Sequence, residues 1–99
     1  MSLEEKIAKL QAATDEAKAQ VDVAKQALDM SQQQLAAAKQ KYKSLSPEAQ
    51  ANLQVNDTEL PELIETELRA RNVYDTVVAK HATNEKYLAA FKQKLGQQS

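Results

Sequence analysis

Only a few side chains in this sequence are of a type and spacing that could bind a metal or move a proton. His81 is the single histidine, so a metal site around it would need other ligands close by. Asn84 and Glu85 are the candidates within one helical turn, and Glu85 at i+4 is more simply a surface ion-pair partner. We therefore predict that His81 is structural and that the chain holds no metal.

Two groups of like charges have spacings that resemble functional clusters. Three glutamates lie three residues apart and could form a cation or acid–base site: Glu59, Glu62 and Glu65. Three lysines alternate near the middle of the chain and could attract nucleic acid: Lys39, Lys41 and Lys43. A helix dipole favours acids in the first turn, and alternate residues do not share one helical face, so solvated surface explains both groups better. The sequence also lacks an HExxH motif, a glycine-rich phosphate loop and a nucleophile–histidine signature, so we predict no enzyme activity, no cofactor and no small-molecule substrate.

The composition narrows the classes of protein to which the chain can belong. Its 99 residues suit one domain, 1–99. Its formal net charge of -1 argues against sequence-independent binding to nucleic acid, which needs a basic surface. It has no cysteine, no signal peptide in MSLEEKIAKL, and no segment near the roughly 18 consecutive apolar residues of a membrane span. We therefore expect a soluble cytoplasmic protein that binds neither nucleic acid nor membrane.

The first half of the chain has the pattern of one long helix, from about residue 3 to about residue 45. Ser2 and Glu5 have the spacing of a capping box, in which each side chain bonds to the other's free backbone N–H. From there, apolar or small residues recur in alternating steps of four and three, which is the heptad spacing of a coiled coil. We call this line, together with its counterpart in the last helix, the seam. In the first helix its members are Leu3, Ile7, Leu10, Thr14, Ala17, Val21, Ala24, Leu28, Ser31, Leu35, Ala38, Tyr42 and Leu45.

Start signals for two further helices follow. Ser46 before Pro47 predicts a short connecting helix over about 47–53, and Pro61 suits the first turn of a last helix over about 60–95. Gly96, directly after Leu95, fits a C-terminal stop. The seam of the last helix is less regular because polar residues interrupt it. Its members are Leu60, Leu63, Glu67, Ala70, Tyr74, Val77, His81, Asn84, Leu88, Phe91 and Leu95.

Folding the two seams together gives a partner to every layer. The layers run from Leu45 with Leu60 at the turn to Leu10 with Leu95 at the open end. Small residues of the first helix face large residues of the last, and the acids that begin the last helix lie near the lysines that end the first. We therefore predict an all-α fold, an antiparallel coiled-coil helical hairpin, with a slip of one heptad left open. Two polar residues either set the register of the seam or stay partly wet: Glu67 and Asn84.

Apolar residues also lie beside the seam, where a solitary hairpin would leave them in water. Such patches usually mark an interface, so we predict that two copies form a four-helix bundle. The interface candidates, which include two residues of the connection, are Val23, Met30, Leu53, Val55, Ile64, Leu68, Val73 and Val78. In the alternative, Leu53 and Val55 fold back over Ile64 and Leu68 and close the core of one chain. A further interpretation is that Leu53 and Val55 simply cap the apolar end of the hairpin.

The segment KYKSL, which precedes the predicted turn, resembles the tip of the α-hairpin in bacterial membrane-fusion adaptor proteins of efflux pumps. The β-rich lipoyl and barrel domains that flank such hairpins have no counterpart in this sequence. Heptad repeats also make all coiled coils alike, whatever they do. We therefore carry no function over from this resemblance.

These patterns indicate a structural or protein-interaction module rather than an enzyme. The expected partners are a second copy of the chain and an unidentified protein, which would contact a helical face or the tip formed by residues 46–59. The alternative is a small helical binding protein, of an immunity type or encoded by a phage, that sequesters a toxin or an assembly subunit.

Overall fold

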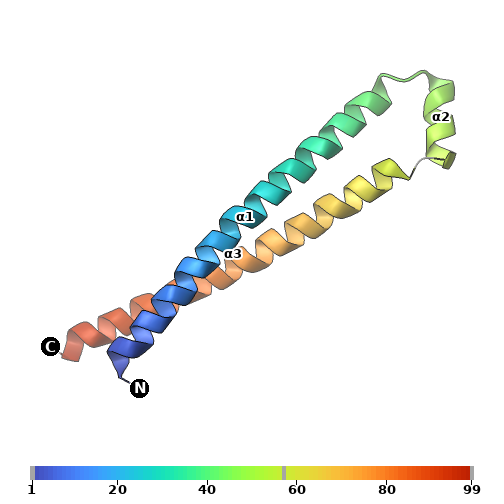
Figure 1. Ribbon diagram of the computed structural model, residues 1–99. Coiled ribbons are helices and arrows are strands. Elements are labelled where there is room, and N and C mark those ends of the chain that lie inside the picture. The colour runs from blue at the N-terminus through green and yellow to red at the C-terminus, as the bar shows by residue number, and fades with distance from the viewer. Residues whose placement is uncertain (1, 57, 99) are drawn as a thin grey trace.

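The computed structural model describes the backbone of residues 2–56 and 58–98, and all of their side chains except those of residues 54–56. It contains helix α1 (Leu3–Lys43), the short helix α2 (Pro47–Asn56) and helix α3 (Glu59–Gln98). Helices α1 and α3 run antiparallel and pack against each other (Figure 1). Helix α2 lies across the end of the hairpin that is opposite to the two termini. The molecule measures 75 × 18 × 14 Å. The predicted all-α helical hairpin is therefore confirmed.

The heptad spacing accounts for which side chains of the two long helices lose contact with water. On α1, the buried and half-buried residues are those of the predicted seam, with Gln11 in addition. On the described part of α3, they are the residues of the seam alone. The most buried residues of the hairpin are mainly small: Thr14, Ala17, Ala24, Ser31, Glu67 and Leu88. The seam is thus a single line of contact between two rods.

The hydroxyl groups in the seam are bonded within their own helix. Thr14 Oγ1 donates to the carbonyl oxygen of Leu10 at 2.7 Å, and Ser31 Oγ donates to that of Leu28 at 2.8 Å. A buried hydroxyl without a partner would cost about 1–3 kcal/mol, and these bonds remove that cost without help from α3. Serine and threonine therefore act in this seam as small residues that let the opposite helix come close.

The predicted layers are not reproduced, because the pockets between the two helices fit the slip of one heptad better. Val77 shares a groove with Gln20 and Ala24, whereas the predicted layers place it opposite Leu28. Leu63 shares a pocket with Gln34 and Ala38, whereas the predicted layers place it opposite Tyr42. Near the open end, Lys92 Nζ lies 3.2 Å from Gln11 Oε1 and links α3 to α1. At the other end, Leu45 and Leu60 line the same pocket.

The capping signals lie where the sequence predicts them, and the helix lengths differ in detail. Ser2 Oγ accepts a bond from the Glu5 N–H at 3.1 Å, and Ser46 Oγ accepts one from the Ala49 N–H at 3.3 Å. Helix α1 ends two residues before the predicted end, and α2 continues to Asn56 rather than stopping near residue 53.

The prediction that Gly96 ends the last helix is wrong, because α3 continues through it to Gln98. Gly96 does not adopt the positive φ of a left-handed cap. A glycine inside a helix costs only about 1 kcal/mol relative to alanine, and less near a helix end, so this residue does not stop the helix by itself.

The corner between α1 and α2 is held by a side chain that the sequence analysis did not single out. Gln50 Nε2 lies 3.1 Å from the carbonyl oxygens of both Tyr42 and Leu45. Tyr42 lies in the last turn of α1, where its carbonyl oxygen also accepts the Leu45 N–H at 3.2 Å, and Leu45 lies in the connection between α1 and α2. Gln50 therefore caps α1 from the next helix and fixes the direction in which α2 leaves.

We expect Gln50→Leu, which keeps the size of the side chain and removes its donors, to lower the free energy of unfolding by about 1 kcal/mol. Urea unfolding followed by circular dichroism measures this change. Gln33→Leu, at an exposed position of α1, is the control and should change stability by less than about 0.5 kcal/mol. Equal effects of the two substitutions would show that the corner bonds contribute nothing.

Candidate interaction surfaces

The seam contains one buried carboxylate. Glu67 is 6 % exposed, and Arg71 on the next turn of α3 donates to its Oε1. The Arg71 side chain is itself 53 % exposed, so it reaches from the seam into water. The interpretation that this position stays partly wet is therefore wrong for Glu67, whereas Asn84 is half-buried.

His81 has the structural partner that its spacing predicts. Its Nε2 lies 3.2 Å from Glu85 Oε1, and its side chain is 20 % exposed. Over residues 2–56 and 58–98, no group of three or more potential ligand side chains is placed to hold a metal ion. The histidine thus lies at the edge of the seam beside an exposed carboxylate.

The predicted clusters of like charge are spread over exposed surface. Glu59 and Glu62 lie in the first turn of α3, as the dipole argument predicts. Glu65 pairs with Arg69 one turn later, and both side chains are mainly exposed. The three lysines at the end of α1 are likewise exposed: Lys39, Lys41 and Lys43.

The charges of α1 are concentrated on one side of the seam. Between residues 11 and 40, six of its seven charged residues lie on that side, with Glu16 as the exception. The six are Asp15, Lys18, Asp22, Lys25, Asp29 and Lys39. The first five alternate in sign at steps of three and four, so each of these five has an opposite charge one turn away.

Residues of α3 continue this surface, which we call the charged side of the hairpin. Asp15 and Lys18 share a pocket with Glu85, Ala89 and Lys92 of α3. Three of the predicted interface residues lie on the same side of α3. Ile64 and Val78 are at whole heptads from Glu85, and Leu68 is one turn after Ile64. Apolar residues on this side therefore face a row of charges across the seam.

The opposite side carries large apolar residues on both long helices, and we call it the apolar side. Val23, Ala27 and Val73 line a shallow groove of about 460 Å³ there, with few polar groups around them. Met30 and Tyr87 lie on the same side, at whole heptads from Val23 and Val73 respectively. Val23 is 67 % exposed, Met30 61 % and Val73 54 %, so nothing in a single chain covers them.

Threonines on the apolar side have their hydroxyl groups bonded within α3. Thr66 donates to the Glu62 carbonyl at 2.9 Å, and Thr76 donates to the Asn72 carbonyl at 2.8 Å. Thr83 makes the same bond to the carbonyl of Ala79 at 2.9 Å. A hydroxyl that is already bonded costs less to remove from water, so these threonines make the surface less polar than their residue type indicates.

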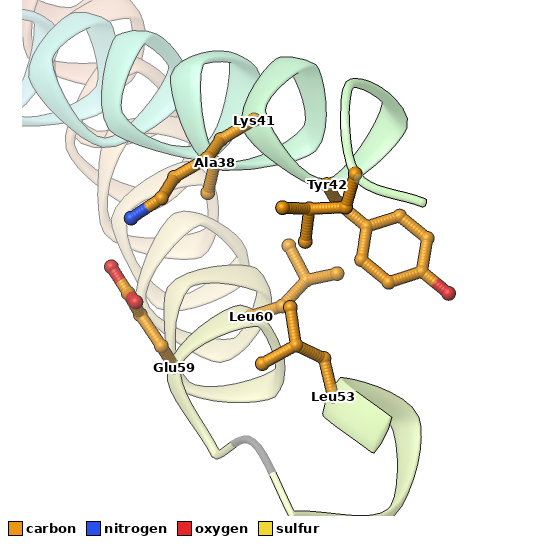
Figure 2. A pocket seen from close by; sticks show the side chains of 7 residues that line it. Ala38, Lys41, Tyr42, Leu53, Glu59 and Leu60 are labelled. Atoms are coloured by element: carbon orange, nitrogen blue, oxygen red, sulfur yellow. The ribbon is translucent and has the colours of Figure 1, made fainter. Parts of the chain in front are cut away.

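A separate pocket of about 200 Å³ lies at the corner where the three helices meet. Figure 2 shows Leu60 and Leu53 beside Tyr42, with Ala38 above them and the charged ends of Lys41 and Glu59 directed toward each other at one edge. The floor of the pocket is apolar and its rim is charged. A pocket of this kind suits a small apolar group that has a polar group beside it.

The structure separates the predicted interface residues into three groups. Val23, Met30 and Val73 lie on the apolar side, whereas Ile64, Leu68 and Val78 lie on the charged side. Leu53 is half-buried in the corner pocket, which agrees with a capping role. The side chain of Val55 lies outside the described residues.

The alternative in which the connection closes over α3 is wrong for Leu53. Ile64 is 46 % exposed and Leu68 is 49 % exposed, so α2 does not cover them. The bonds from Gln50 to the end of α1 direct α2 across the corner instead. The apolar residues on both sides of the hairpin consequently remain in contact with water.

Comparison of the chain with protein-family models, with curated proteins and with solved structures returned no match. Within the described residues, none of the helices is both long enough and apolar enough to cross a membrane.

The buried pair Glu67–Arg71 and the exposed pair Glu65–Arg69 allow a matched test of the seam. We expect Glu67→Leu to raise the free energy of unfolding by about 1 kcal/mol or more, because an apolar side chain avoids the desolvation of a buried charge. Glu65→Leu should change it by less than about 0.5 kcal/mol. Urea unfolding at one protein concentration measures both.

Arg71→Leu should change the free energy of unfolding in the opposite direction. It leaves the Glu67 carboxylate without its partner in the seam, so we expect a loss of about 1–3 kcal/mol. A stabilising effect of Arg71→Leu, or a destabilising effect of Glu67→Leu, would contradict the assignment of Glu67 as a costly buried charge.

Proposed function

We propose that the protein is a non-enzymatic structural or protein-interaction module that associates with a second copy of itself. The observation that carries this proposal is the position of its large apolar side chains. Seven of them are exposed on the described surface: Val23, Met30, Ile64, Leu68, Val73, Val78 and Tyr87. Such a surface favours association, because each Å² of apolar surface removed from water contributes about 25 cal/mol.

The thin interior of the hairpin supports this proposal. Among the described residues, Leu88 is the one large apolar side chain that is classed as buried, and the others in the seam are only half-buried. A chain of this length has little interior in any fold, and a rod has less than a sphere. Packing two hairpins into a four-helix bundle would supply the missing interior.

The shape of the molecule supports binding to another protein more than it supports chemistry on a small molecule. The hairpin is 75 Å long and no more than 18 Å wide, so its sides offer long surfaces and shallow grooves. Recognition of a partner by helical faces uses such surfaces. We propose that an unidentified protein binds either the side that the second copy leaves open or the tip at 46–59. The cytoplasm stays the predicted location.

Light scattering tests self-association directly, because it measures mass independently of the elongated shape. We expect the mass to approach twice the 11.0 kDa of one chain as the concentration rises, and to fall toward 11.0 kDa on dilution. A mass of one chain at every concentration would overturn the proposal.

A further inference from the structure

We infer that the second copy docks on the apolar side, around Val23 and Val73, and leaves the charged side with Ile64, Leu68 and Val78 open. This inference rests on the proposed self-association and adds the surface through which it occurs. The sequence alone groups all of these residues as one interface, but they lie on opposite sides of the hairpin. A single two-fold contact between flat hairpins covers one side only.

The charges of α1 distinguish the two sides, whereas α3 carries charged residues on both. Glu16 lies at the groove of the apolar side, and the difference on α1 begins after it. On the apolar side of α1, the stretch from Ala19 to Ala37 carries no charged residue. Over the same stretch the charged side of α1 presents Asp22, Lys25 and Asp29. Removing ionised groups from water costs more than their pairing returns in most geometries, so the charged side is the less favourable surface to bury.

Several polar groups on the apolar side are bonded within α3 and so cost less to bury. Its threonines donate within α3, as described for Thr66, Thr76 and Thr83. Arg69 is paired with Glu65 of its own helix. Lys80 lies on this side as well, and its long aliphatic stem can cover apolar surface while its ammonium group stays in water.

The size of the surface suits a second hairpin. One side of the molecule extends over 75 by 18 Å, which leaves room for the roughly 800 Å² of accessible surface that each partner buries in a stable interface. A copy of the same chain brings the same groove and the same stretch of α1, which is uncharged on this side from Ala19 to Ala37. It therefore meets no opposing row of like charges at the centre of the contact.

The test compares two double variants that make the same chemical change on opposite sides. Val23→Lys with Val73→Lys places charges on the apolar side, and Ile64→Lys with Val78→Lys places them on the charged side. All four positions are exposed helical sites, and lysine is a better helix former than valine or isoleucine. Circular dichroism checks that each variant stays helical.

Light scattering over a dilution series gives the dissociation constant of each protein. We expect the dissociation constant of the Val23/Val73 variant to be higher than that of the unaltered chain by about tenfold or more. The dissociation constant of the Ile64/Val78 variant should stay within about threefold of the unaltered value. The reverse ranking, or equal losses, would overturn the assignment of the side. A single-chain mass for the unaltered protein would instead overturn the proposed self-association.

A milder pair of variants keeps the test decisive if the lysine variants lose helicity. Val23→Ala with Val73→Ala removes apolar surface without adding charge, and Ile64→Ala with Val78→Ala is its counterpart. The same ranking of dissociation constants is expected. Weaker association of the Ile64/Val78 alanine variant alone would contradict the inference.

Discussion

A hairpin of two helices can turn only one line of side chains on each helix toward the other, and this limit shapes the rest of the molecule. The buried and half-buried residues of α1 and α3 follow that line. Because several residues of α1 on the line are small, α3 can approach closely, but little apolar volume is enclosed. The large apolar side chains that do not fit on the line remain outside.

Polar residues in the seam show how the hairpin tolerates such a thin interior. Thr14 and Ser31 donate to carbonyl oxygens of their own helix, so they need no hydrogen-bond partner on α3. Glu67 relies on Arg71, whose side chain leads from the seam to water. The corner relies on Gln50, which donates to carbonyl oxygens at the end of α1 and in the connection to α2. Thr14, Ser31 and Glu67 are therefore satisfied within their own helices.

Much of this fold could be predicted from the sequence, because heptad spacing and capping residues are local signals. The seam, the antiparallel arrangement and the caps at Ser2 and Ser46 follow from residues within a few positions of one another. Gln50 could not be identified in this way, since its bonds join two helices and any exposed glutamine could make them. The continuation of α3 through Gly96 was missed because glycine permits a stop without imposing one.

The two sides of the hairpin could be predicted only in part. Heptad positions already separate Val23 and Val73 from Ile64 and Val78, but only the structure shows which side of α1 lies beside which side of α3. The central claim, which rests on the proposed self-association, is that a second copy stabilises the hairpin, since the seam alone encloses little apolar volume. Thermal unfolding by circular dichroism over about a thousandfold range of concentration tests it most directly. The account predicts a midpoint that rises with concentration, and a midpoint independent of concentration would contradict it.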